Sequence, residues 1–549
     1  MGQRVLICFR RLLGQGKSAI VKDALACLAV ANLYLLDVWR TLLIPARQYH
    51  LLILPRPIDF GLAILNILGF AVVMSIALAL ARQCIGERGA STLALLYLSL
   101  LFIFLVRAYN LDSYWPNRIR ALAVTLVGSG LLATWKSPER LSKIFRSIGL
   151  ALLPCLVVTT AHSAESLFLS HVESGSALSR PAGIGHRPPK VARTALIIFD
   201  MLDFDLLFGH KPADVNVPAF EQLRTETLFA TNAESPAAFT ELSLPAMTIG
   251  KVVTDTNPIS PNDLLLTVEG SPRKSHWTLE PSIFSEARNS GMAVGIVGWY
   301  HPYCRLFRPM LSSCEWVPIP GRLKDRGPTG WETERAITEM LVDDLIGPGP
   351  NVIQIIVNKE KNGRQRYIDS YRRLLHAATE ALTDNALNLV VVHLSVPHTP
   401  PIYKRSKQEF STEEGDYLDN LELADRTLAV LRHEMAKAGL WESTNIVITS
   451  DHGFRSAGPP NWNHNATPLH VPFFLKISGF HEHIEDNHRL NTIIVHDLLL
   501  DLLNNKITTP LGAKDFLDQH SPYGCRTQPT DSLQRMEGTE TFEKPHQCE

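Results

Sequence analysis

The chain has 549 residues, a formal net charge of −1 and 46% hydrophobic residues, which leaves room for two or three structural units. Because positive and negative charges balance and no long run of one sign is present, a nucleic-acid partner is not expected. The long apolar runs are concentrated before residue 164, and the rest of the chain has the composition of a soluble domain.

Residues 1–163 are predicted to form a transmembrane domain of about five helices. Five apolar stretches approach the roughly 20 residues that cross a bilayer, although Asn32, Asp37 and Arg40 interrupt the first. The loops on one side of these stretches hold eleven lysine and arginine residues, and the loops on the other side hold five. The positive-inside rule therefore places the residues after Ser163 outside the cytoplasm, in the periplasm or at the cell exterior. The stretches are Ala24–Ile44, Phe60–Ala81, Ala90–Val106, Ile119–Trp135 and Ser147–Ser163.

Residues 164–193 are predicted to be a linker, because they are rich in Ser, Gly, Pro and His and lack periodicity. Residues 194–520 are predicted to form an α/β domain with a mostly parallel sheet flanked by helices, since short apolar runs alternate with helical stretches. Residues 521–549 form a polar tail without a recognisable motif. The predicted strands are Thr194–Phe199, Val294–Gly298, Val352–Val357, Leu389–Leu394, Asn445–Ser450 and Phe473–Ile477, and the predicted helices are Ser282–Ser290 and Thr427–Ala438.

The eight cysteines contain no paired C-x-x-C zinc motif. Cys304 and Cys314 close a short loop in the α/β domain. An oxidising compartment favours a disulfide between them, and two free thiols are the alternative.

Polar residues that suit a metal follow two of the predicted strands. Asp451 and His452 come directly after one strand, and Asp200 comes directly after another, with Asp203 as a further candidate. Carboxylate oxygen and imidazole nitrogen suit Zn²⁺ or Mn²⁺, and open α/β sheets bind ligands at the carboxyl ends of their strands. The alternatives are an Asp-His-Gly turn capped by Asp451 and a helix N-cap at Asp200.

Thr240 is the candidate nucleophile. A hydroxyl at the start of a helix, beside free backbone N–H groups, is well placed to attack an anionic ester once a metal or base has activated it. A simple helix-capping role for Thr240 is the alternative.

Four histidines and a lysine are candidate substrate or second-metal residues. His393 and His398 lie on either side of a predicted strand end, with Lys404 just beyond. Histidines bind metals or donate to phosphate oxygens, and a cation such as Lys404 would meet an anionic head group. A proline-rich turn with incidental surface charges is the alternative. His464 and His470 follow the Asp-His pair, and we expect one of them to lie in the site.

Together these motifs resemble the alkaline phosphatase superfamily, in its sulfatase-like branch, and in particular the membrane-anchored phosphoethanolamine transferases and lipoteichoic acid synthases. Thr-Glu-Leu-Ser-Leu-Pro-Ala-Met, from Thr240, is similar to the transferases' Thr-x-x-Ser-x-Pro-x-Met, which implies that Thr240 is the nucleophile. The segment from His398 to Arg405 is similar to their His-Gly-Pro-x-x-Tyr-Lys-Arg, which implies a substrate or second-metal role for His398. Asp451 and His452 match the metal-binding Asp-His pair of the family.

Two features depart from the family patterns. The transferases have Glu where Asp200 stands, and sulfatases have two adjacent aspartates, whereas Asp200 and Asp203 are separated here; the number of metal ions therefore stays open. The sulfatase signature needs Cys or Ser as nucleophile with Pro two and Arg four residues later, where this chain has Thr240, Leu242 and Leu244. Formylglycine cannot be made from Thr, so ordinary sulfate-ester hydrolysis is not expected.

The residues and the resemblance together predict a metal-dependent enzyme with its site on the outer side of the membrane. Zinc, or alternatively manganese, would be held by Asp200, Thr240, Asp451 and His452 and would activate the threonine hydroxyl. The reaction would be transfer of a phosphoethanolamine- or glycerophosphate-type group, with membrane lipids as partners and a lipid-linked donor or other anionic ester as substrate. The alternatives are hydrolysis of a phosphate or sulfate ester and a degenerate domain that only binds, although such a domain would have lost the nucleophile or a ligand.

Overall fold

The chain divides into two compact units, each built from separate stretches of sequence. The computed structural model describes residues 17–109, 116–173, 192–321, 323–346, 359–455 and 469–520. The helical unit comprises Met1–Gln48, Ile53–Ala177 and Arg326–Val357. The sheet unit comprises Tyr49–Leu52, Leu178–Asp325 and Asn358–Glu549. Tyr49–Leu52 group with the sheet unit although they lie within the predicted membrane domain, and Arg326–Val357 group with the helical unit although they lie within the predicted α/β domain. The contiguous domains predicted from the sequence do not set these two stretches apart.

Among the described residues, the helical unit has three helices that are long and apolar enough to cross a membrane. These are Pro57–Cys84, Glu87–Ala108 and the continuous stretch Pro138–Glu165; the pair Ala19–Tyr34 and Leu36–Leu43, bent by 60°, would make a fourth span. The predicted span at Ile119–Trp135 falls in a helix whose apolar part, Ala121–Lys136, is too short to be a candidate span. The unit therefore fits a membrane domain with three to four candidate spans, fewer than the five predicted.

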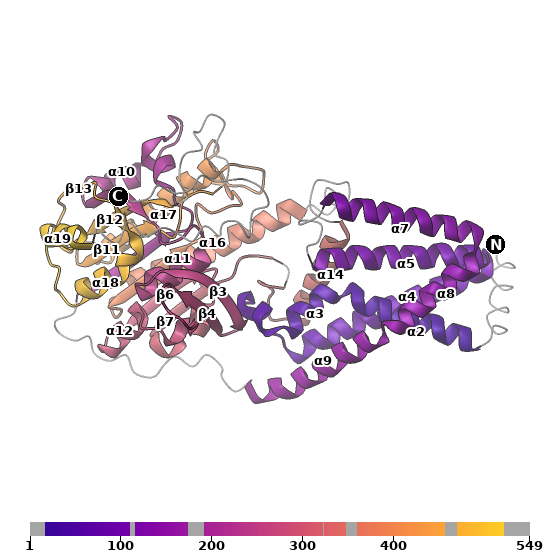
Figure 1. Ribbon diagram of the computed structural model, residues 1–549. Helices are drawn as coiled ribbons and strands as arrows, with labels where there is room; N and C mark the ends of the chain where they lie inside the picture. Colours follow the sequence, from indigo (N-terminus) through magenta and orange to yellow (C-terminus); the bar gives the residue numbers. More distant parts are fainter. Residues whose placement is uncertain are drawn as a thin grey trace. The chain divides into compact units, whose positions relative to one another are not determined.

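The helices of this unit lie alongside one another (Figure 1). Large apolar side chains of the span Pro57–Cys84 are exposed, for example Leu65 and Val73 at 63% and 66%, as expected of a surface that contacts lipid. The last helix of the series runs to Glu173, so the first part of the predicted linker is helical. The helices are α2 (Lys17–Tyr34), α3 (Leu36–Leu43), α4 (Pro57–Cys84), α5 (Glu87–Ala108), α7 (Pro116–Lys136), α8 (Pro138–Ala151), α9 (Leu153–Glu173) and α14 (Gly330–Ile346).

The sheet unit is organised around one mixed, mostly parallel sheet, which confirms the predicted α/β class. The strand order is β13-β2-β12-β11-β1-β8-β6-β7, with β14 paired to β2. The five strands from β11 to β7 run parallel, and β12 is antiparallel to both of its neighbours. The strands are β1 (Arg193–Phe199), β2 (Leu228–Glu234), β6 (Val294–Trp299), β7 (Ser313–Val317), β8 (Leu389–Leu394), β11 (Thr444–Ser450), β12 (His470–Lys476), β13 (Ile484–Asp486) and β14 (Leu490–Asn491).

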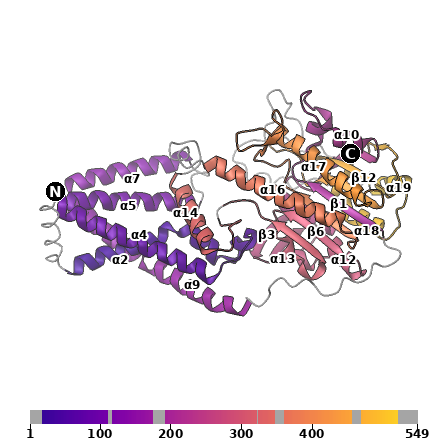
Figure 2. The ribbon, with the colours of Figure 1, turned by 180° about the vertical axis from the view of Figure 1, so that it is seen from behind.

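Helices cover both faces of this sheet, which explains why its central strands are apolar throughout. In β1, Leu196 and Ile198 join a core with α11 (Thr240–Ile249), α12 (Ile283–Asn289) and α18 (Val495–Leu503), together with α19 (Pro510–His520). Ala195, Ile197 and Phe199 join the opposite core, with α10 (Pro218–Arg224), α16 (Lys359–Thr383) and α17 (Tyr417–Lys437). Figure 2 shows α16 and α17 beside β1.

Smaller elements complete the sheet unit. A three-stranded sheet and a two-stranded hairpin lie apart from the main sheet. They are β3 (Val253–Ser260), β4 (Asp263–Val268) and β5 (Ser275–His276), and β9 (Tyr403–Lys404) with β10 (Glu409–Phe410); the short helices are η1 (Pro45–His50), η2 (Asp205–Gly209), η3 (Trp277–Leu279), α13 (Tyr303–Leu306), η4 (Arg308–Met310) and η5 (Thr492–Ile494).

The predicted strands agree with the structure except for Val352–Val357, which lies outside the described residues. Helix α17 begins ten residues before the predicted start at Thr427. The physical reason is an N-cap at Asp416, whose side chain accepts a hydrogen bond from Asp419 N at 3.0 Å.

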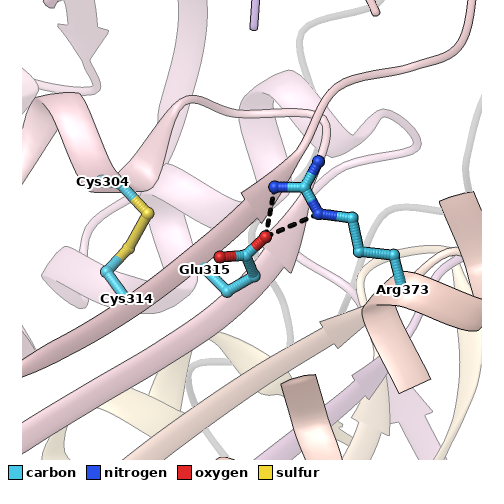
Figure 3. Close-up of a disulfide and its surroundings, with 4 residues drawn as sticks. All are labelled: Cys304, Cys314, Glu315 and Arg373. Atoms are coloured by element: carbon cyan, nitrogen blue, oxygen red, sulfur yellow. Dashed lines mark hydrogen bonds and ion pairs between the residues drawn. A yellow bond between two sulfur atoms is a disulfide. The ribbon is translucent and has the colours of Figure 1, made fainter. Parts of the chain in front are cut away.

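Cys304 and Cys314 form a disulfide, the first of the two alternatives considered for them. The bond joins α13 to β7 across a Cα–Cα distance of 5.6 Å. Beside it, Arg373 of α16 forms an ion pair with Glu315 of β7 (Figure 3). The bridge and the ion pair both attach elements to the outer strand of the parallel part of the sheet.

Candidate active site

Neighbouring parallel strands bring the candidate site residues to one edge of the sheet. The register pairs Phe199 of β1 with Ser450 of β11 and with Leu394 of β8. The residues that follow the first two of these, Asp200 and Asp451, therefore leave the sheet at the same level. This edge holds the carboxyl ends of the strands, where α/β proteins place their ligands.

Asp200, Asp451 and His452 form a buried cluster. One ligand atom from each of the three lies within 4.8 Å of the others, and none of the three side chains is exposed. His452 Nδ1 lies 2.8 Å from Gly453 O, so Nδ1 is the donor of that bond and Nε2 is the nitrogen that faces the acids. That nitrogen lies 3.7 Å from Asp200 Oδ1 and 3.6 Å from Asp451 Oδ2.

The donor atoms of this cluster fit a divalent metal. Asp200 Oδ1 and His393 Nε2 are buried and have no hydrogen-bond partner among the described residues. A buried carboxylate oxygen without a donor is costly unless a cation compensates it. Two carboxylates and an imidazole nitrogen are ligands that zinc and related ions accept.

The hydroxyl of Thr240 points into the cluster. It donates to Asp451 Oδ2 at 2.7 Å and lies 3.5 Å from Asp200 Oδ2 and 3.4 Å from His452 Nε2. Thr240 is the first residue of α11, and the N-cap position is occupied by Phe239, which makes no side-chain cap bond. The hydroxyl therefore faces the buried acids instead of capping the helix, unlike the alternative considered from the sequence.

A hydrogen bond joins the start of α11 to Asp451, which follows β11. Ser243, one turn further along the helix, donates from Oγ to Asp451 O at 2.5 Å. The helix ends at Gly250, whose φ of 65° closes it in the left-handed conformation. Thr240 is thus held at a defined distance from the acids.

Asp200 is kept ionised. Burial raises the pKa of its carboxyl, but the neighbouring His398, His393 and His452 outweigh that effect and hold the pKa below its usual range. Trp299 Nε1 also donates to Asp200 Oδ2 at 2.8 Å. An ionised acid with one unpartnered oxygen is suited to hold a cation.

The segment from Trp299 to Tyr303 also contributes to the site, although no motif in the sequence indicated it. Besides the bond from Trp299 to Asp200, Tyr303 Oη lies 3.2 Å from His393 Nδ1. Nδ1 is also 3.2 Å from the carbonyl oxygen of Trp299. This leaves His393 Nε2 directed at Asp200 Oδ2, 3.6 Å away. The available signal was an aromatic run directly after the predicted strand Val294–Gly298.

The same segment contacts the helix that carries Thr240. Tyr300 donates from its hydroxyl to Glu241 Oε2 at 2.6 Å. His301 Nε2 lies 3.4 Å from the carbonyl oxygen of Thr240. Burial lowers the pKa of His301 well below its usual range, so the ring is neutral.

His398 lies near the cluster, and Lys404 forms its contacts elsewhere. The ring of His398 is 5.2 Å from the ring of Trp299, and its Nδ1 is 2.5 Å from Thr399 O. Lys404 forms an ion pair with Asp419 at 3.5 Å.

Asp203 and His470 are occupied by other partners. Asp203 accepts from the backbone N–H groups of Leu206 and Phe454, at 2.9 and 3.1 Å, and burial raises its pKa to about 6. His470 lies 3.3 Å from Asp205 through Nδ1 and 3.0 Å from Thr231 O through Nε2. His464 lies outside the described residues.

The family model described as sulfatase matches residues 196–504. No curated protein matches the chain at a significant level.

Three of the solved structures that match the chain are the following. Ps i-CgsB in complex with k-i-k-neocarrahexaose is 15% identical, with a TM-score of 0.41, covering 62% of this chain and 79% of that one. Phosphonate monoester hydrolase of Agrobacterium radiobacter is 14% identical, with a TM-score of 0.36, covering 57% and 77%. Human ectonucleotide pyrophosphatase / phosphodiesterase 5 is 13% identical, with a TM-score of 0.36, covering 59% of this chain and 100% of that one.

Proposed function

The chain belongs to the sulfatase family, and from this premise we propose that it is a membrane-anchored, metal-dependent enzyme that transfers a phosphoryl-type group through Thr240. The observation that carries the proposal is the hydroxyl of Thr240, 2.7 Å from Asp451 Oδ2 and facing the Asp200–His452 pair. A hydroxyl at a helix start that faces buried acids has the arrangement of an activated nucleophile.

The identity of the nucleophile favours phosphorus over sulfur chemistry. Threonine cannot be converted to formylglycine, and Leu242 and Leu244 stand where the sulfatase signature has Pro and Arg. An unmodified hydroxyl attacks a phosphoester directly and forms a phosphothreonine.

The transfer occurs in two displacements. Thr240 Oγ1 forms a bond to phosphorus while the bond from phosphorus to the leaving oxygen breaks, and the hydroxyl proton leaves along the hydrogen bond to Asp451 Oδ2. His398 donates a proton to the leaving oxygen. An acceptor hydroxyl then forms a bond to phosphorus and gives its proton to His398, while the bond from phosphorus to Thr240 Oγ1 breaks. The proton on Asp451 Oδ2 returns to Thr240 Oγ1 and restores the hydroxyl. A divalent cation held by Asp200, Asp451 and His452, with zinc and manganese the two candidates, would supply positive charge that acidifies the hydroxyl and offsets charge on the phosphoryl oxygens.

Two observations support an extracytoplasmic site. The Cys304–Cys314 disulfide is typical of an oxidising compartment. With the five crossings predicted from the sequence, the excess of lysine and arginine in the loops on the opposite side of the apolar stretches gives the same orientation. With candidate spans in the same chain, a lipid-linked donor is the substrate class that this anchoring favours.

The test uses the purified full-length chain with a chromogenic phosphodiester and the matching sulfate ester. Thr240→Ala is expected to abolish phosphodiester cleavage, and Thr240→Ser to retain part of it. Thr379→Ala is the matched control, because Thr379 Oγ1 bonds only within α16, to Leu375 O at 2.9 Å. A phosphothreonine at position 240, found by mass spectrometry, would support the two-step reaction.

Three outcomes have distinct meanings. Phosphodiesterase activity that persists in Thr240→Ala would disprove the nucleophile. Cleavage of the sulfate ester alone would overturn the phosphoryl assignment. A head group that appears on an added alcohol distinguishes transfer from hydrolysis.

A further inference from the structure

Four residues that precede α4 belong to the sheet unit. Tyr49–Leu52 group with the sheet unit, although the residues on both sides of them in the sequence group with the helical unit. Tyr49 is only 1% exposed and joins the same apolar core as the nucleophile helix α11. Because these residues lie far outside the family match at 196–504, their position needs a physical explanation.

Hydrogen bonds fix the backbone of this segment. Arg305 donates to Tyr49 O at 2.5 Å and to Leu51 O at 2.6 Å. Leu52 N donates to Lys324 O at 2.7 Å. The tyrosine side chain is therefore delivered to a defined place beside the end of β6.

The hydroxyl of Tyr49 meets a histidine that contacts the nucleophile residue. Tyr49 Oη lies 3.0 Å from His301 Nδ1, and His301 Nε2 lies 3.4 Å from the carbonyl oxygen of Thr240. A carbonyl oxygen only accepts, so Nε2 carries the hydrogen and Nδ1 of the neutral ring accepts from the tyrosine. The hydroxyl of Tyr49 thus selects the tautomer that bonds to Thr240.

Tyr300, the residue before His301, likewise contacts both the segment before α4 and helix α11. Tyr300 has a φ of 72°, a left-handed conformation that is unfavourable for a non-glycine residue and persists where its surroundings hold it. His50 Nδ1 lies 3.2 Å from Tyr300 O, and the Tyr300 hydroxyl donates to Glu241 at 2.6 Å. Tyr49 therefore contacts His301, and His50 contacts Tyr300. His301 and Tyr300 in turn contact the first two residues of α11.

We propose that Tyr49 is a positioning residue for the nucleophile: by bonding to His301 it fixes the start of α11 and keeps the Thr240 hydroxyl directed at the buried acids. The inference rests on the proposed function of Thr240. It makes the active site dependent on a segment that precedes α4 and lies outside the residues that match the family.

The experiment compares full-length variants in two measurements, phosphodiester turnover and hydrogen exchange of the α11 peptide amides. Tyr49→Phe keeps the buried ring and removes only the hydroxyl. Tyr371→Phe is the matched control, since Tyr371 is a buried tyrosine of the sheet unit whose hydroxyl bonds to Thr427 at 2.7 Å. His301→Asn and the double variant Tyr49→Phe/His301→Asn complete a cycle.

Tyr49→Phe is expected to lower kcat about tenfold, the fold-change of one net buried hydrogen bond, with KM unchanged and faster exchange in peptides that cover 240–249. Tyr371→Phe should change neither quantity. Because Tyr49 acts through His301, the double variant should have the kcat of His301→Asn alone.

Four results would overturn the inference: an unchanged exchange rate of α11 in Tyr49→Phe, an equal effect of Tyr49→Phe and Tyr371→Phe, fully additive effects in the cycle, or faster exchange of α11 without a fall in kcat. Hydrogen exchange needs no turnover. If the wild-type chain cleaves no phosphodiester but α11 exchanges faster in Tyr49→Phe, the proposed function fails while the structural link stands. If exchange increases and kcat does not fall, the positioning role is overturned, because the link then does not prepare the nucleophile for reaction.

Discussion

Two fully buried aspartates, one in each unit, have opposite surroundings. Asp59 of α4 accepts at both oxygens, from Arg326 at 2.6 Å and Arg56 N at 2.7 Å on Oδ2 and from Thr333 at 2.8 Å on Oδ1. Asp200 of the sheet unit has Trp299 on Oδ2, and its Oδ1 has no hydrogen-bond partner among the described residues.

The difference separates an acid that is fully hydrogen-bonded within the protein from one that is not. A carboxylate surrounded by donors and a guanidinium is satisfied within the protein and holds elements together. A carboxylate with an unused lone pair in a buried cluster, next to an acid and an imidazole, still has capacity for a cation. The predictions below test this distinction on four carboxylates, in order of decreasing effect.

The largest effect is expected for Asp59→Asn. Removing the negative charge leaves Arg326 buried without its counter-ion, and breaking such a pair costs about 3 to 5 kcal/mol of unfolding free energy. Thermal unfolding of the purified chain, followed by circular dichroism, measures the loss. A variant as stable as the wild type would mean that Asp59 is no more structural than Asp200.

Asp200→Asn should instead remove the response to metal. A ligand that binds only the folded state, at a concentration about a hundredfold above its Kd, adds about 2.7 kcal/mol of stability. Zinc or manganese added to chelator-treated protein should stabilise the wild type by about that amount and the variant far less, with turnover lost. Metal content by elemental analysis checks the result, and Asp369→Asn, on the exposed face of α16, is the control.

Asp425 is an intermediate case, a buried acid held by backbone N–H groups. Phe220 N donates to it at 2.9 Å, and burial raises its pKa to about 6. Because the folded-state pKa lies above the unfolded value, its contribution to stability is complete below about pH 4 and is lost as the pH rises through 6. Asp425→Asn keeps a side-chain oxygen that accepts hydrogen bonds but cannot ionise. As the pH rises from about 4 to about 7, the unfolding free energy of the variant should increase by about 2 kcal/mol relative to that of the wild type. Parallel curves of melting temperature against pH would contradict this.

The smallest effect is expected at Glu315, an acid at the surface. Its ion pair with Arg373 leaves 36% and 48% of the two side chains exposed. Exposed pairs contribute at most about 1 kcal/mol, so Arg373→Gln should lower the unfolding free energy by less than that. Added salt should reduce the difference further.

The sequence predicted the sheet well because its central strands are buried on both faces. Such strands are unbroken apolar runs, as in Leu389–Leu394, whose bounds are those of β8. Motif order also predicted the cluster of Thr240, Asp200, Asp451 and His452, because carboxyl ends of parallel strands share one edge.

Contacts between residues distant in sequence left no such signal. The roles of Trp299 and His301 depend on β6 lying two strands from β1, and nothing in their local sequence specifies a partner. The same holds for Arg326, whose position in the helical unit comes from a contact with Asp59, and for Tyr49. Asp203 was a reasonable metal candidate by composition, yet backbone N–H groups occupy its oxygens.

The Asp59–Arg326 pair has a consequence for biosynthesis. Its partners are separated by 267 residues, so at about 5 to 20 residues per second the ribosome adds Arg326 some 10 to 50 s after Asp59. During that interval α4 is already available for insertion while the carboxylate in its first turn lacks its guanidinium. The helical unit is therefore completed only after much of the sheet unit has been translated.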